Sequence, residues 1–146
     1  MSEKDWRRGD FPVLREHPTR WADVDAYGHV NNVVHYALFD TAVNAWLIEE
    51  SGVDVRTLPA MGLVVETSCR YSAELGFPGV VTSGLRLARL GTSSVAYELA
   101  LFDGPAGDDG PPAAAGRFVH VYVDRDTRRP VPPPDPVRAA LARLER

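Results

Sequence analysis

One long apolar segment constrains the fold of this chain more than any other feature. Residues 33–50, VVHYALFDTAVNAWLIEE, contain no glycine or proline and carry apolar side chains on most of the helix circumference. This pattern predicts a buried helix. Asn31 or Asn32 can cap its start, and Gly52 can adopt the left-handed conformation that ends a helix. Asp40 lies inside this apolar pattern, so we expect its carboxylate to be buried and to need a hydrogen-bond donor.

The remainder of the chain predicts β-strands. After residue 60, glycines and prolines separate four apolar runs, at residues 63–75, 80–90, 93–102 and 117–123. Residues 103–116 form a flexible connecting loop in this prediction, and residues 13–24 are a weaker strand candidate. We therefore expect an α+β fold in which a curved antiparallel sheet of five or six strands wraps the helix. One such sheet leaves part of an apolar helix open, so we also expect a partner subunit.

The length of 146 residues predicts a single domain, residues 1–146. Residues 1–10 are polar and are expected to form a disordered tail. Residues 135–146 predict a short amphipathic helix that Asp135 could cap.

Composition excludes several classes of function. The formal charge of −4 is small and of the wrong sign for a nucleic-acid partner. No apolar run approaches the roughly 20 residues of a membrane-spanning helix. The single cysteine, Cys69, cannot form an intramolecular disulfide, and the polar start does not resemble a signal peptide. These features predict a cytoplasmic protein.

A polar bend precedes the long helix. Residues 20–36, RWADVDAYGHVNNVVHY, allow three chemistries. Asp23 and Asp25 alternate, so on a strand they would share one face, and mutual repulsion would raise the pKa of one of them, as a general base or nucleophile requires. The alternative is that both are solvated turn residues.

The other two chemistries use different parts of the bend. Asp23, Asp25, His29 and His35 include metal-ligand types, although their spacing matches no common closed metal site. The backbone offers the third option, because Gly28 permits a tight turn and the first N–H groups of the helix lack internal partners. Such amides can polarise a carbonyl oxygen, and a carboxylate just upstream would complete an acyl-transfer site.

The segment WADVDAYGHVNNVVHYALFDTAVNAWL, followed by VVETSCRYSAELGFPGVVTSGLRLARLGTSSVAYELALF, resembles hot-dog-fold acyl-CoA thioesterases of the 4-hydroxybenzoyl-CoA thioesterase-like branch. The resemblance covers residues 13–129 and implies a hot-dog fold with a long central helix. It implies hydrolysis of an acyl-CoA, with coenzyme A as part of the substrate, no other cofactor and no metal. It also implies a homodimer or homotetramer.

The resemblance also implies roles for individual residues. Asp25 corresponds to the catalytic carboxylate, and the carbonyl-polarising backbone amide falls on Asn32 or Val33. His35 departs from the family pattern, in which many members have a tyrosine. The remaining candidates for substrate binding or orientation are Asp23, Tyr27, Gly28, His29, Asn31, His35, Tyr36, Glu66, Ser93 and Ser94. Two alternatives stay open: an acyl carrier protein in place of coenzyme A, and a non-catalytic acyl-binding or assembly module.

Overall fold

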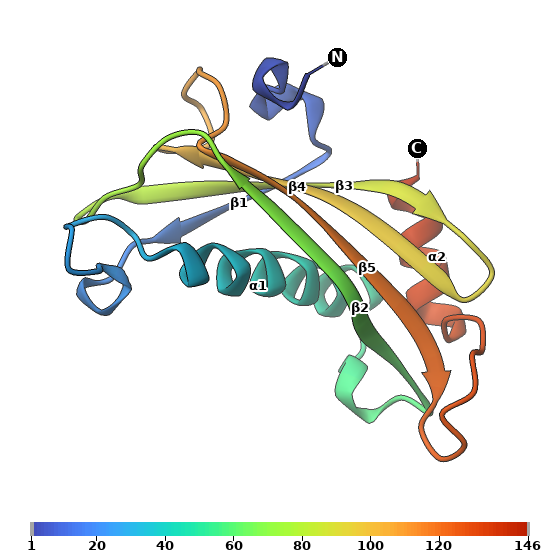
Figure 1. Cartoon of the computed structure of the whole chain (residues 1–146). Coiled ribbons are helices and arrows are strands. Elements are labelled where there is room, and N and C mark those ends of the chain that lie inside the picture. The colour runs from blue at the N-terminus through green and yellow to red at the C-terminus, as the bar shows by residue number, and fades with distance from the viewer. Residues whose placement is uncertain (1, 146) are drawn as a thin grey trace.

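A five-stranded antiparallel sheet curves over one long helix (Figure 1). The computed structural model describes residues 2–145. The strands, in the sheet order β1-β3-β4-β5-β2, are β1 (Val13–Pro18), β3 (Val80–Leu90), β4 (Ser94–Asp103), β5 (Ala114–Asp124) and β2 (Ala60–Tyr71). The helices are α1 (Asn32–Ser51), which lies across the concave face, and α2 (Asp135–Leu144), which contacts α1 and β3. The predicted α+β hot-dog architecture is confirmed.

Both ends of α1 have the caps that the sequence predicts. The side chain of Asn31 accepts a hydrogen bond from the backbone N–H of Val33, and Gly52 ends the helix in the left-handed conformation, with φ of 73°. The side chains of Phe39, Val43 and Leu47 are buried between α1 and the sheet. These contacts fix the helix, and with it the polar bend at its start, against the strands.

Two predicted boundaries are wrong. The strand expected over residues 13–24 ends at Pro18 and is followed by a 3-10 turn, Trp21–Asp23. The loop expected over residues 103–116 is shorter, because β5 already begins at Ala114. The small residues at the start of β5 lack the bulky apolar side chains that mark a strand in sequence, yet they are buried and pair with β2 and β4.

The segment before β1 is ordered rather than a disordered tail. Residues 2–10 include two 3-10 turns, Glu3–Asp5 and Arg8–Asp10. Trp6 and Phe11 form a second apolar cluster with Ala100, Phe102 and Ala115 on the convex side of the sheet, opposite α1 (Figure 1). At the other end of the chain, α2 begins at Asp135 with Pro134 in the cap position, so Asp135 is not the cap.

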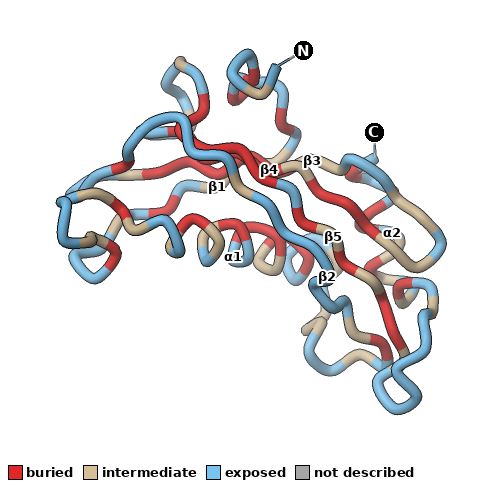
Figure 2. Tube along the Cα trace, in the orientation of Figure 1, coloured by how far each residue is buried: buried red, intermediate tan, exposed pale blue. Residues whose placement is uncertain are grey.

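One side of the molecule lacks apolar cover. β2 is an edge strand and is exposed along most of its length, whereas β4 and β5 are largely buried (Figure 2).

Asp40 is exposed on α1, and its carboxylate accepts a hydrogen bond from the side chain of Asn44, so the expectation of a buried carboxylate is wrong. No helix among residues 2–145 is both long and apolar enough to cross a membrane.

Candidate active site

The polar bend folds into a tight loop at the start of α1. The N–H of Asp25 donates to the carbonyl of His29 over 2.9 Å, and Gly28 supplies the left-handed turn with φ of 81°. The N–H of Val30 then donates to the carbonyl of Leu75 over 2.8 Å. This last bond attaches the loop to the segment that follows β2.

The carboxylates in the bend have different environments. Asp23 is buried and pairs with Arg20, with 2.8 Å between Oδ1 and the Arg20 Nη2. The hydrogen bond from the Arg20 side chain lowers the pKa of Asp23. The expectation that Asp23 and Asp25 share one strand face is therefore wrong, and the pKa of Asp23 is lowered rather than raised. Because Asp23 ends a 3-10 turn, its side chain is committed to Arg20.

Asp25 retains a free oxygen. It is half-buried, and its Oδ1 accepts hydrogen bonds from the backbone N–H groups of Tyr27, over 2.9 Å, and His29, over 3.3 Å. Within residues 2–145, its Oδ2 has no hydrogen-bond partner. The loop thus holds the carboxylate through one oxygen and leaves the other available.

The first amides of α1 also differ. The N–H of Val33 already donates to the Asn31 side chain over 3.2 Å, and the N–H of Val34 donates to the Asn31 carbonyl over 2.9 Å. The N–H of Asn32 has no hydrogen-bond partner in the described part of the chain. The two amides predicted to polarise a carbonyl are those of Asn32 and Val33. Because the N–H of Asn32 is the unpaired one, the geometry favours Asn32 for this role.

A hollow of about 200 Å³ brings these groups together. Four of the predicted residues line it: Asp25, His29, Asn32 and His35. The other lining residues are Val30, Tyr71, Ala73, Glu74 and Leu75, from the loop and from the end of β2 and the segment after it. Asp25, which has a free oxygen, and Asn32, which has an unpaired N–H, therefore line one cavity, and acyl transfer can use such a pair.

His35 contributes a neutral imidazole to the hollow. Its ring is buried, and burial lowers the pKa of His35. Its Nδ1 lies 3.2 Å from the carbonyl oxygen of Asn31, and because a carbonyl only accepts, Nδ1 carries the proton. The other ring nitrogen, Nε2, is then a hydrogen-bond acceptor.

Sequence reasoning missed Tyr71 and Glu74. The hydroxyl of Tyr71 donates to the Asn32 carbonyl over 2.8 Å, and its ring packs edge-on against His35. Partial burial and the nearby Cys69 thiol raise the pKa of Tyr71 to about 12, so the hydroxyl keeps its proton. Glu74 pairs with His29 over 2.9 Å. No local pattern marks either residue, because only the tertiary fold places the end of β2 beside the start of α1.

Comparison with known proteins identifies the family of this chain. The sequence model of the Thioesterase-like superfamily matches residues 19–141, which include the whole bend, α1 and all strands except β1. The chain belongs to the Thioesterase-like superfamily. The comparison with curated proteins gave no match.

Several solved protein structures are also similar to this chain. The PA5185 protein from Pseudomonas aeruginosa strain PAO1 is 52% identical, with a TM-score of 0.88 over 95% of each chain. PA2801 from Pseudomonas aeruginosa, described as a putative thioesterase, is 32% identical, with a TM-score of 0.77 over 88% of this chain and 96% of that one. A thioesterase from Thermus thermophilus, complexed with coenzyme A and Zn, is 27% identical, with a TM-score of 0.75 over 92% of this chain and 95% of that one.

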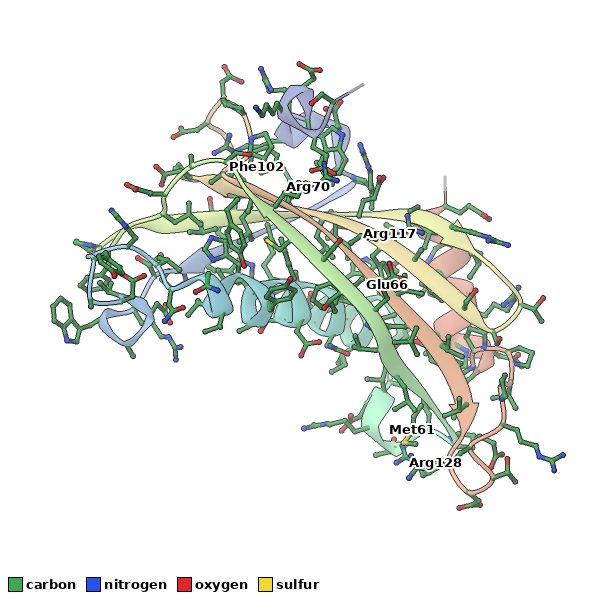
Figure 3. All side chains as sticks on the ribbon, viewed as in Figure 1. Met61, Glu66, Arg70, Phe102, Arg117 and Arg128 are labelled. Atoms are coloured by element: carbon green, nitrogen blue, oxygen red, sulfur yellow. The ribbon has the colours of Figure 1, made fainter. Side chains whose placement is uncertain are left out.

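In this thioesterase-like chain, other predicted site residues lie away from the hollow. Tyr27 is 84% exposed at the tip of the loop, and Tyr36 stacks on Phe118 in the core. Glu66 is exposed midway along β2 (Figure 3). Ser93 and Ser94 lie at the β3–β4 turn, where the Ser93 carbonyl accepts from the N–H of Tyr122.

The predicted metal-ligand types in this thioesterase-like chain do not form a cluster. No group of three or more His, Cys, Asp or Glu side chains within residues 2–145 is arranged to hold a metal ion. Asp23 pairs with Arg20, His29 pairs with Glu74, and His35 bonds to a backbone carbonyl.

Proposed function

We propose that this protein hydrolyses an acyl-CoA thioester to the free acid and coenzyme A. The observation that carries the proposal is the hollow at the start of α1, where the free Oδ2 of Asp25 and the unpaired N–H of Asn32 occur together. An oxygen nucleophile or base beside a fixed donor is the minimum machinery for acyl transfer.

The thioester carbonyl oxygen accepts a hydrogen bond from the N–H of Asn32. The positive end of the α1 dipole adds to this stabilisation as negative charge develops on the oxygen. In one route, Asp25 attacks the carbonyl carbon, the C–S bond breaks, coenzyme A leaves as the thiolate, and water then hydrolyses the mixed anhydride. In the other, Asp25 takes a proton from water as the water oxygen attacks the carbonyl carbon, the C–S bond breaks, and coenzyme A leaves as the thiolate, which takes up the proton. Both routes yield one acid and one thiol.

His35 and Tyr71 shape the hollow around this reaction. The Nε2 acceptor of His35 can orient a water molecule or a substrate N–H, because its Nδ1 proton is already committed to Asn31. The Tyr71 hydroxyl holds the Asn32 carbonyl, which stiffens the first turn of α1. Coenzyme A as the carrier is supported by the Thermus thermophilus relative, which was solved with coenzyme A bound.

A homodimer through β2 is part of the proposal. Leu63, Val64 and Val65 are consecutive, apolar and 39%, 47% and 59% exposed on this edge strand. Long apolar edge strands are aggregation sites unless another strand pairs with them. Antiparallel pairing of two copies along the whole of β2 would place its Ala60 end opposite the Tyr71 end of the partner strand, next to the partner's hollow.

Replacing Asp25 with Asn tests the assignment. We expect Asp25→Asn to reduce thiol release from a panel of aliphatic and aromatic acyl-CoAs by at least about 100-fold, because the amide is neither a nucleophile nor a base. The thermal midpoint should change little, since the Asn Oδ1 can still accept both backbone bonds. The control is Asp109→Asn, an exposed loop carboxylate that should retain full activity. Near-normal turnover by Asp25→Asn would reject the proposed role of Asp25.

A further inference from the structure

An ion pair at the hollow joins two segments that are far apart in the sequence. The Nε2 of His29 lies 2.9 Å from Oε2 of Glu74, and both residues line the hollow. His29 belongs to the polar bend, whereas Glu74 belongs to the segment between β2 and β3. Because a carboxylate only accepts, Nε2 of His29 carries the proton, and the hydrogen bond is present whether or not the ring is charged.

The backbone of His29 is bonded to Asp25 at two points. Its N–H donates to Oδ1 of Asp25 over 3.3 Å, and its carbonyl accepts from the N–H of Asp25 over 2.9 Å. A separation of 3.3 Å is at the long limit for an N–H···O bond, so a small movement of His29 would break it. The other donor to Oδ1 is the N–H of Tyr27, a residue that is 84% exposed at the tip of the loop. The position of His29 therefore controls how firmly the Asp25 carboxylate is held.

The backbone next to the ion pair is fixed on both sides. Leu75, which follows Glu74, is 1% exposed, and its carbonyl accepts from the N–H of Val30, which follows His29. This anchor places Glu74 beside His29, although the Glu74 side chain is 71% exposed. An ion pair this exposed contributes little to the stability of the whole fold. Its effect is expected in the local geometry of the bend.

We propose that Glu74 is a positioning residue for thioester hydrolysis. It holds the side chain of His29, and through the backbone of His29 it fixes the Asp25 carboxylate in the hollow. The inference rests on the proposed function, and in this arrangement Glu74 does not touch the substrate. Misplacement of a reacting group by about 1 Å can lower a rate by up to about 100-fold, so a looser carboxylate should be visible in kcat.

Substitution of Glu74 tests this role. We expect Glu74→Ala to lower kcat by about tenfold and to change KM by less than about twofold, because only the placement of Asp25 is altered. Glu74→Gln should retain at least about half of the wild-type kcat, since its Oε1 can still accept the Nε2 proton. Unchanged kcat in Glu74→Ala, or an equal loss in both variants, would overturn the proposal.

Glu50→Ala is the matched control for the loss of an ion pair. It removes another exposed pair, in which Oε1 of Glu50 lies 2.7 Å from Nε of Arg143, and neither residue lines the hollow. Glu50→Ala should therefore retain full activity. A loss of kcat in Glu50→Ala as large as that in Glu74→Ala would overturn the proposal.

A double-mutant cycle shows whether Glu74 acts through His29. In the His29→Ala background, Glu74 has no side chain to hold, so Glu74→Ala should change kcat by less than about twofold. If the Glu74 carboxylate acted on the substrate itself, its removal would lower kcat by the same factor in both backgrounds. That result would overturn the positioning role.

Amide hydrogen exchange distinguishes failure of this inference from failure of the proposed function. In the protein without substrate, Glu74→Ala should speed exchange of the N–H groups of Asp25 and His29 by about threefold or more. Exchange of the N–H of Val30, which is bonded to Leu75, should stay within about twofold of the wild-type rate. If the wild-type protein hydrolyses no thioester but exchange rises in this way, hydrolysis is rejected and the positioning of Asp25 stands. If it hydrolyses thioesters and Glu74→Ala changes neither kcat nor exchange, hydrolysis stands and the role of Glu74 is rejected.

Discussion

Hydrogen-bond partners decide which residues of the bend are available for chemistry. Asp23 and Asp25 have the same side chain, but Asp23 is committed to Arg20 while Asp25 keeps one oxygen free. The same distinction separates the amide of Val33, which Asn31 occupies, from that of Asn32. Residue type alone therefore identifies candidate catalytic groups, and their hydrogen-bond partners determine which of them are free to react.

A single glycine controls how closely α1 approaches the sheet. A Cβ atom at Gly116 would lie 2.5 Å from a ring carbon of Phe39 and 2.9 Å from the carbonyl oxygen of Ser68. We expect Gly116→Ala to lower the free energy of unfolding by about 1–3 kcal/mol through overpacking, measured by urea denaturation.

Gly107→Ala is the matched control, because nothing lies within 4 Å of its added Cβ. It should change stability by less than about 0.5 kcal/mol. Equal effects of the two alanine substitutions would contradict the close approach at Gly116.

At the scale of elements, periodic segments were predictable and the contacts between them were not. The long helix follows from its apolar pattern and its caps, and β3 has the predicted bounds of residues 80–90. The start of β5 was missed because alanine and glycine give no strand signal. Asp25 was predicted from the bend and the family resemblance, but Tyr71 and Glu74 line the hollow only because the fold places the end of β2 and the segment after it beside the start of α1.

The free edge of β2 carries a prediction about assembly. A lysine at Val65, which is 59% exposed, would place like charges near one another in a symmetric strand pair. We expect Val65→Lys to sediment as a monomer and to lose thioesterase activity together with the dimer, while the wild-type protein sediments as a dimer or larger. Thr92→Lys, at the exposed β3–β4 turn, should leave the oligomer intact. A monomeric wild-type protein would contradict pairing through β2.

Across the whole molecule, three buried histidines link stability to pH. His17, His35 and His120 lie on β1, α1 and β5, and burial lowers the pKa of each one below 6.5. The unfolded chain therefore binds more protons than the folded one as pH falls through this region. The contribution of these histidines to the free energy of unfolding is therefore fully present above neutral pH and is lost on acidification.

Urea denaturation between pH 8 and pH 5 measures this linkage. We expect the free energy of unfolding to decrease below about pH 7, by up to about 1.4 kcal/mol per pH unit for each histidine that stays neutral in the folded state. Asp23, whose pKa is lowered by Arg20, should contribute only at lower pH, as the medium approaches its unfolded value of 3.8. His17→Gln should reduce the slope between pH 7 and pH 5. A flat profile over that range would contradict the neutral state of the buried histidines.

The strand order determines when, relative to translation, two subunits can assemble. β2 bonds within the sheet only to β5, whose first residue, Ala114, is translated long after Tyr71 has been made. A nascent chain that has produced β1, α1 and the β3–β4 hairpin still lacks the strand that pairs with β2. Subunits that join through β2 must therefore meet after translation of β5, so assembly is expected between finished chains rather than on the polysome.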